Sequence, residues 1–317
     1  MAEPILRARD IMVSFDAAQR PAVAETSLEI RAGDAIGIVG ESGSGKTTLA
    51  RVLVGALAPS SGSVEVLGRS WSTVGHADPI RRKVQMIFQD PYASLNPRMT
   101  ARDTVAEVLR IWNNWSRNEA REMAAERLAE VGIARSALDR RPTGLSGGQC
   151  QRVGIARALA CDPDVLIADE PTSSLDVSVQ ANILNMLVGF RESRGLALVF
   201  ISHDLSVVRY ITNRALVMYR GRVIEAGATA RLLSEPAHPY TLCLIDSIPG
   251  AARAPQLARN LSSDRGCVFA ARCSRIGDHC DELEPELVES GDGHRAACHY
   301  PLSGHLLSAQ PGVKELT

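Results

Sequence analysis

The chain has 317 residues, of which 45% are hydrophobic and 22% are charged, and its formal net charge is −1. These values are ordinary for a globular protein with one large domain and an extension, and they exclude a strongly basic protein built for bulk nucleic-acid binding. No apolar run approaches the roughly 20 residues that a membrane-spanning helix needs. The first residues lack a basic stretch followed by an apolar core, so we expect no signal peptide and a chain that is soluble by itself.

The first informative element is the glycine-rich segment at residues 40–47, GESGSGKT, which fits the pattern G-x-x-x-x-G-K-[ST]. It follows an apolar run at residues 35–39, which predicts a buried strand, and it precedes a helical pattern at residues 48–54. Backbone N–H groups of such a loop face one anion, and the positive end of the following helix points to the same place. The order strand, loop, helix therefore predicts a phosphate-binding loop.

Further along the chain, apolar runs continue to alternate with helical patterns, which predicts an α/β core. The stretch from Thr100 to Gly144 differs, because helical patterns at residues 103–112 and 119–131 follow each other without a strand. It predicts an all-helical subdomain. Ser146, Gly147 and Gly148 then open a helix through Ala160. The expected strands cover residues 28–30, 35–39, 63–67, 84–88, 165–168, 198–201, 214–219 and 222–225.

The expected strand at residues 165–168 ends in two acids, Asp169 and Glu170. Carboxylates at the C-terminal edge of a buried strand are suited to a phosphate site, where one holds Mg²⁺ and the other polarises the attacking water. Taken alone, the same pattern also fits a strand that simply ends in solvated acids. Because a phosphate-binding loop precedes it, we favour the catalytic interpretation.

Taken together, these motifs resemble those of the nucleotide-binding subunits of ABC transporters, over roughly residues 5–250. Gln89 lies in IFQD at residues 87–90, and LSGGQ at residues 145–149 matches the signature motif. SSLD at residues 173–176 matches the D-loop, and His203 in ISHD matches the switch histidine. The resemblance implies a P-loop NTPase fold with an antiparallel β subdomain, an all-helical subdomain and a small Cys-rich C-terminal extension.

The resemblance also implies a role for each motif. Glu170, His203 and Gln89 are the expected catalytic residues, and Thr47, Gln89 and Asp169 are the expected Mg²⁺ ligands. Phe15 lies where the family places an aromatic ring that stacks on adenine. The expected ATP-contacting residues are Phe15, Gly40, Ser42, Gly43, Ser44, Gly45, Lys46, Thr47, Thr48, Gln89, Ser146, Gly147, Gly148, Gln149, Asp169 and Asp176.

Three of these residues have simpler interpretations when each is considered alone. Phe15 continues the alternation of Ile11 and Val13, so it could be a core aromatic residue of a strand. Gln89 could be an ordinary surface side chain, and His203 could be structural. Only the concerted pattern of motifs favours a functional role for them.

The resemblance implies that one chain does not complete an ATP site, since the signature motif grips ATP held by the opposite subunit. The expected partners are a second ABC ATPase, either a sister D-type subunit or a second copy, two membrane permeases and an extracytoplasmic solute-binding protein. No nucleic-acid partner is expected, and the chain would lie peripherally at the cytoplasmic face of the cell membrane. The segment QDPYASLNPR at residues 89–98 and HPYT at residues 238–241 resemble the peptide/nickel importer branch, and residues 148–157 resemble its F-type ATPase.

Four of the seven cysteines cluster near the end of the chain, at Cys267, Cys273, Cys280 and Cys298. Their spacings are wider than usual zinc pairs and match no ferredoxin pattern, so spacing alone leaves zinc, an iron–sulfur cluster and plain thiols open. This segment resembles the C-terminal extension of peptide-importer ATPases, which implies a [4Fe–4S] cluster on these four cysteines.

The sequence thus predicts an ABC ATP-binding domain at residues 1–250, with its helical subdomain at about 92–150, and an extension at residues 251–317. The expected function is an ATPase that couples ATP hydrolysis to the import of oligopeptides or dipeptides. Nickel, glutathione or another small solute stays open as cargo, because the ATPase does not touch it. A non-transport ABC ATPase is the remaining alternative, but the chain has one nucleotide site and lacks coiled-coil or DNA-binding insertions.

Overall fold

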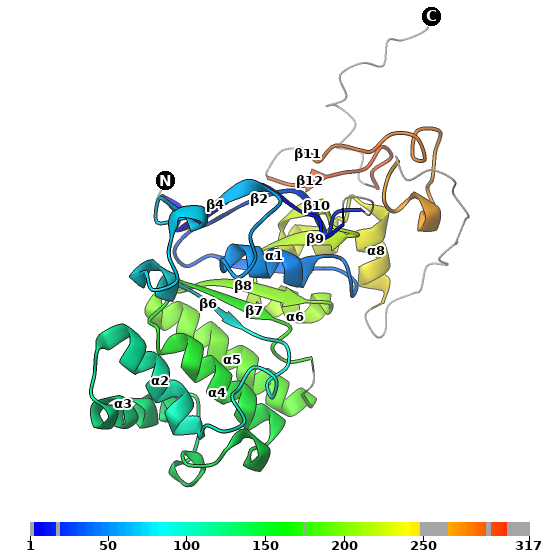
Figure 1. Ribbon diagram of the computed structural model, residues 1–317. Coiled ribbons are helices and arrows are strands. Elements are labelled where there is room, and N and C mark those ends of the chain that lie inside the picture. Colours follow the sequence, from blue (N-terminus) through cyan, green and yellow to red (C-terminus); the bar gives the residue numbers. More distant parts are fainter. Residues whose placement is uncertain (1–2, 17–19, 174, 248–265, 290–292, 303–317) are drawn as a thin grey trace, which may run out of the picture. The chain divides into compact units, whose positions relative to one another are not determined.

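The structure, a computed structural model, describes residues 3–16, 20–173, 175–247, 266–289 and 293–302 (Figure 1). Its contacts divide the chain into two compact units, each of which collects segments that lie far apart in the sequence. Unit 1 comprises Met1–Arg9, Ser27–Ala35 and Ala50–Ile201. Unit 2 comprises Asp10–Thr26, Ile36–Leu49 and Ser202–Thr317.

Strands and helices alternate through most of the chain, as the sequence predicts. The strands are β1 (Leu6–Val13), β2 (Val23–Ile30), β3 (Ala35–Val39), β4 (Ser61–Val66), β5 (Arg69–Ser70), β6 (Val84–Ile87), β7 (Val165–Asp169), β8 (Ala197–Ser202), β9 (Arg214–Tyr219), β10 (Arg222–Ala228), β11 (Val288–Glu289) and β12 (Arg295–Ala296). The α-helices are α1 (Lys46–Leu53), α2 (Ala101–Asn113), α3 (Arg117–Glu130), α4 (Gly147–Leu159), α5 (Val177–Arg194), α6 (Leu205–Ile211), α7 (Thr229–Ser234) and α8 (Pro239–Asp246). Among these described helices, none is long and apolar enough to cross a membrane.

The expected strands are confirmed, and β3 and β9 have the predicted bounds. Helix α1 begins at Lys46, two residues earlier than the sequence pattern indicates, because the Leu49 amide already bonds to the Gly45 carbonyl at 2.9 Å. Strand β2 begins at Val23 rather than residue 28. Residues 23–27 alternate less regularly between buried and exposed positions, so the periodicity of the sequence does not predict that they belong to the strand.

The strand that carries the two acids lies inside a parallel arrangement in unit 1. Strand β7 pairs with β6 on one side and with β8 on the other, in parallel register. Every residue of β7 and β8 is buried. Parallel strands covered on both faces need continuous apolar runs, so these runs could be recognised in the sequence. A separate sheet has the strand order β2-β1-β4-β5.

Between β6 and β7, all residues of which the structure describes, the regular elements are helices without a strand. Helices α2 and α3 pack along each other and against α4 (Figure 1). Helix α3 begins with a capping box in which Ser116 and Glu119 satisfy each other's backbone amides. The prediction that this stretch is all-helical is confirmed.

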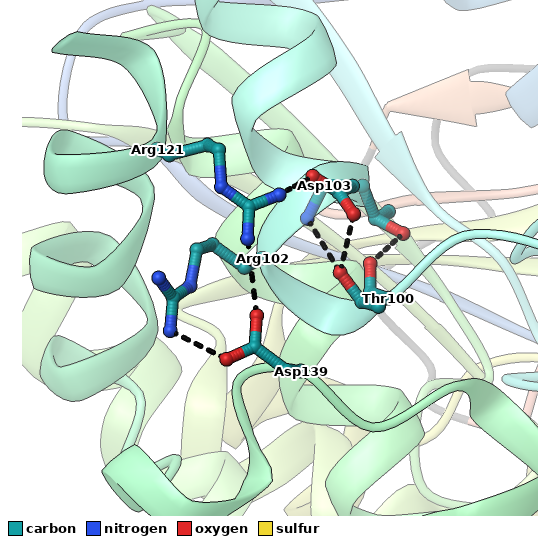
Figure 2. A network of polar contacts seen from close by, with 6 residues as sticks. Thr100, Arg102, Asp103, Arg121 and Asp139 are labelled. Carbon is teal, nitrogen blue, oxygen red and sulfur yellow. Dashed lines mark hydrogen bonds and ion pairs between the residues drawn. The ribbon is translucent and has the colours of Figure 1, made fainter. Parts of the chain in front are cut away.

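A polar network joins the start of α2 to α3 and to the loop before α4 (Figure 2). The Thr100 hydroxyl caps α2 and donates to the Asp103 carboxylate at 2.7 Å. Arg121 forms ion pairs with both Asp103 and Asp139, and Arg102 donates to Asp139 at 2.8 Å. Burial opposes ionisation of Asp103, but its bond from Thr100 and the Arg121 charge outweigh this effect and lower its pKa. The network therefore fixes two helices of unit 1 through charged bonds.

Unit 2 is built on β3, which pairs in parallel with β9. Strand β10 returns antiparallel to β9, and β12 and then β11 extend the sheet, so the C-terminal part of the chain contributes edge strands. The register between β9 and β10 shifts between Val223 and Glu225. The Ile224 carbonyl accepts from the Ala297 amide at 2.8 Å, a ladder bond of the pairing between β10 and β12.

A fully buried carboxylate attaches these late segments to β10. Glu225 is 0% exposed and accepts from the backbone amides of Ala237 and His238 at 2.7 and 2.8 Å. The His294 Nε2 atom, directly before β12, lies 2.8 Å from the same carboxylate. A buried charge is tolerated only when its oxygens are satisfied, and here three groups from two later segments satisfy them.

Candidate functional site

The predicted phosphate-binding loop connects β3 to α1 in unit 2. A Cβ atom at Gly40 would lie 2.2 Å from the Met218 carbonyl oxygen, so only glycine fits there. At Gly45, φ is +100° and a Cβ atom would lie 2.1 Å from the Ala22 carbonyl oxygen. Both positions therefore require glycine, because a backbone carbonyl from another segment approaches each of them closely.

Two polar side chains of this loop, Ser44 and Lys46, are buried. Lys46 is 5% exposed, and its Nζ donates to the carbonyls of Gly40 and Glu41 at 2.7 and 2.9 Å. The buried Ser44 hydroxyl has no hydrogen-bond partner within the residues that the structure describes. A buried amine, a buried hydroxyl and a helix N-terminus together fit an anionic phosphate.

The remaining predicted residues of unit 2 are more accessible. Thr47 and Thr48 are half-buried in the first turn of α1, and Ser42 and Gly43 are exposed in the loop. His203 is exposed directly after β8 and before α6, which Asp204 caps.

Phe15 follows β1 and its exposed fraction is 73%. The alternative of a core aromatic residue is therefore wrong, although Ile11 and Val13 are buried as that alternation requires.

In unit 1 the structure brings two expected catalytic residues together. Asp169 ends β7 and is 2% exposed, and Glu170 follows it with φ +42°. A positive φ is unfavourable for glutamate, and such strain concentrates at functional sites. The Gln89 Nε2 donates to Glu170 Oε2 at 3.1 Å. This contact joins residues from the ends of neighbouring strands β6 and β7, and sequence reasoning did not predict it.

The signature motif opens α4, as predicted. The Ser146 hydroxyl accepts from the Gln149 amide at 3.2 Å, and the Gln149 side chain accepts from the Ser146 amide at 3.0 Å. A Cβ atom at Gly148 would lie 2.8 Å from Val179 of α5, while one at Gly147 would lie 3.6 Å from Leu175. The small residues therefore let the start of α5 approach this helix N-terminus.

Asp176 is the N-cap of α5. Its carboxylate accepts from the Val179 amide at 3.0 Å and from the Ser178 hydroxyl at 2.7 Å. These bonds lower its pKa, the bond from Val179 most of all. Asp176 therefore has a structural role within its own chain, beside any role toward a partner.

Comparison with known proteins places these motifs in a family. Residues 23–173 match the family described as ABC transporter, and residues 224–280 match the family described as oligopeptide/dipeptide transporter, C-terminal region. The oligopeptide transport ATP-binding protein OppF of Haemophilus influenzae is 40% identical over 293 residues, which cover 87% of this chain and 88% of that protein. The chain belongs to the ABC transporter ATP-binding family. This ABC ATPase is also 40% identical to the oligopeptide transport ATP-binding protein AppF of Bacillus subtilis, over 88% of its own length and 89% of AppF.

Solved structures agree with this family. The ATP-binding cassette MJ0796, solved as a dimer in a post-hydrolysis state bound to ADP and Pi, has a TM-score of 0.65 and 29% identity to this ABC ATPase. The likeness covers 71% of this chain and 98% of that chain. The predicted α/β cassette fold and ATPase class are confirmed. A separate Cys-rich extension beyond residue 250 stays a prediction, and its expected start lies outside the described residues.

The expected [4Fe–4S] cluster is wrong. Among the described residues, which include all four cysteines, no three or more His, Cys, Asp or Glu side chains are grouped so that they could hold a metal ion, and this also removes the zinc alternative. Burial raises the pKa of Cys267 to about 11 and of Cys298 to about 12, so both thiols are protonated at neutral pH. All four residues are free cysteines: Cys267, Cys273, Cys280 and Cys298.

Sequence reasoning missed the contacts that Glu41, Tyr240 and Arg272 make around the phosphate-binding loop. Glu41 occupies a variable position of the loop pattern, so the pattern assigns it no role. Arg272 lies in the C-terminal segment, where the sequence patterns point to a role only for the cysteines. The residues are separated by up to 231 positions, and no local signal connects them.

Proposed function

We propose that this protein is the ATP-hydrolysing, energy-coupling subunit of an importer for oligopeptides or dipeptides. The observation that carries the proposal is the combination of a built phosphate-binding loop with a C-terminal region, residues 224–280, that matches the oligopeptide/dipeptide transporter family. The names of OppF and AppF, both oligopeptide transport ATP-binding proteins, support the same cargo.

In this proposal, the phosphate-binding loop holds the β- and γ-phosphates of ATP. Lys46 exchanges its bonds to the loop carbonyls for bonds to phosphate oxygens, and the Ser44 hydroxyl gains an acceptor. The Thr47 hydroxyl and the Asp169 carboxylate offer the oxygen ligands that Mg²⁺ prefers. Bound Mg²⁺ supplies positive charge that neutralises the phosphates during hydrolysis. Phe15, which is exposed and aromatic, stacks on the adenine ring.

Glu170 acts as the general base that polarises the attacking water. The hydrogen bond from Gln89 supports this assignment, because it orients the carboxylate and links it to the segment that leads into the helical part of unit 1. His203 contacts the γ-phosphate and distinguishes ATP from ADP. These roles come from the family resemblance together with the positions described above.

A second ATPase subunit completes each ATP site with its own signature residues, Ser146 to Gln149, and with Asp176. That subunit is a D-type sister or a second copy of this chain. Two membrane permeases and an extracytoplasmic binding protein complete the importer, and the ATPase lies at the cytoplasmic face of the membrane. The dimeric state of the MJ0796 cassette supports this arrangement.

The catalytic assignment is tested with Glu170→Gln. Removing the base should lower ATP turnover by about 10²–10⁴-fold while ATP binding is retained, so the variant should form a stable ATP-dependent dimer. The matched control is Glu192→Gln, which changes an exposed carboxylate on α5 and should leave turnover unchanged. Wild-type turnover in Glu170→Gln would refute the assignment of the base.

The cargo is tested in cells that lack this chain. Uptake of a labelled tripeptide should fall to background and return when the wild-type chain, but not Glu170→Gln, is supplied. Retained peptide uptake together with lost nickel or glutathione uptake would replace peptides by that solute. Retained uptake of all three would favour a non-transport ATPase.

A further inference from the structure

The C-terminal part of the chain contacts the phosphate-binding loop directly within unit 2. Arg272 ends the short 3₁₀-helix η5 (Ala270–Arg272). Its two terminal nitrogens donate to the two oxygens of Glu41 at 2.8 and 2.9 Å. A planar guanidinium matched to a carboxylate in this way is the strongest common form of ion pair, and it fixes direction as well as distance.

Arg272 is held in place by an aromatic cluster. Its guanidinium lies 5.7 Å from the ring centroids of both Tyr219 and Phe269. Phe269 is 1% exposed, and Tyr240 is 0% exposed and lies 4.6 Å from Tyr219 between ring centroids. Contact with these rigid rings restricts the long arginine side chain, so less conformational entropy is lost when it binds Glu41.

Glu41 is held at each of its polar groups. Its amide donates to the Tyr240 hydroxyl at 2.9 Å, and its side chain accepts the fork of Arg272. Its carbonyl accepts from Lys46 Nζ at 2.9 Å and from the Ser44 amide at 3.2 Å. Glu41 is thus the single residue that connects the Arg272 side chain with Lys46 and Ser44 of the phosphate-binding loop.

Charge gives this contact a functional direction. Glu41 places a carboxylate within a loop that must bind a highly anionic triphosphate, and like charges at close range oppose binding. Arg272 neutralises that carboxylate and holds it beside the aromatic cluster. Burial of the arginine opposes its charge, but the bond to Glu41 is the larger effect and raises the Arg272 pKa further, so it stays protonated.

We propose that Arg272 is a positioning residue for ATP, acting through Glu41, and that the C-terminal region thereby sets the nucleotide affinity of the phosphate-binding loop. This inference rests on the proposed ATP binding and goes beyond it, because it gives the C-terminal region a role at the nucleotide site. Arg272 does not touch the reacting groups. Its loss changes the affinity for ATP and leaves the maximal rate of hydrolysis nearly unchanged.

The test measures the dissociation constant of the full-length chain for a fluorescent ATP analogue with Mg²⁺, together with KM and kcat for ATP. Arg272→Gln keeps most of the side-chain volume but removes the charge, and it should raise the dissociation constant and KM about tenfold at nearly constant kcat. The matched control is Arg231→Gln, which breaks the ion pair of a similarly half-buried arginine with Glu235 in the same unit and should change neither value.

A double variant separates the proposed role from a general loss of structure. In Glu41→Gln/Arg272→Gln the repelling carboxylate is absent, so the dissociation constant should return to within about threefold of the wild type. Damage to folding would not be repaired by a second substitution of this kind.

A wild-type dissociation constant for Arg272→Gln, or a double variant that binds no better than Arg272→Gln, would overturn the inference while the proposed function stands. Absence of nucleotide binding by the wild-type chain would overturn both.

Discussion

Lowering the pH from 7 to 5 is expected to destabilise the protein through His238, the N-cap of α8. His238 is 1% exposed, and its Nδ1 accepts from the Tyr240 amide at 3.0 Å. Its Nε2 is buried and has no hydrogen-bond partner among the described residues. Burial lowers its pKa from 6.5 to about 4, against the opposing influence of the Glu225 charge.

The direction of the effect follows from these two values. The folded protein keeps His238 neutral, whereas the unfolded chain takes up a proton below about pH 6.5. The stability contribution is therefore complete above pH 6.5, decreases as the pH falls, and is fully lost near pH 4. For these pKa values, linkage gives a loss of about 2 kcal/mol in the free energy of unfolding between pH 7 and pH 5.

The variant His238→Asn isolates this contribution, because asparagine keeps an oxygen acceptor at the N-cap but does not titrate. Thermal unfolding of both proteins is measured at pH 7 and pH 5. The wild type should lose about 3 °C more in Tm than the variant does. His76→Asn removes an exposed histidine and should behave like the wild type. Equal pH dependence in the wild type and His238→Asn would refute the reasoning.

Further predictions concern the phosphate-binding loop and the helical network. Gly45→Ala should weaken binding of a fluorescent ATP analogue by more than about 100-fold, because its Cβ meets a backbone carbonyl at 2.1 Å, and near-normal binding would contradict the loop geometry. Gly43→Ala, where φ is +78° but nothing lies within 4 Å, should cost only backbone strain of about 1 kcal/mol and weaken binding less than tenfold. Arg121→Ala removes the ion pairs to Asp103 and Asp139 and should lower the free energy of unfolding, measured by denaturant titration, by about 1–2 kcal/mol. An unchanged free energy of unfolding would show that the network adds no stability.

Local patterns in the sequence determined the phosphate-binding loop, the buried strands and, to within two residues, the starts of helices α1 to α4. Lys46 is recognisable because glycines, a preceding apolar strand and a following helix all lie within about twenty residues. Caps such as Ser146 and Asp204 are equally local, since the groups they satisfy are two or three residues away. For the same reason the helical stretch between β6 and β7 was predicted, and β7 was recognised by its continuous apolar run.

Only the tertiary structure decided which distant side chains meet. The pairs Gln89–Glu170 and Glu41–Arg272 join residues 81 and 231 positions apart, and no periodicity or spacing encodes such a pairing. The same limit explains the error in the tail, since four cysteines close in sequence do not define a metal site until their side chains converge. Phe15 shows the converse case, because an alternating pattern continued past the last paired residue of β1 into an exposed position. Sequence records local preference, whereas contact depends on how separate segments pack.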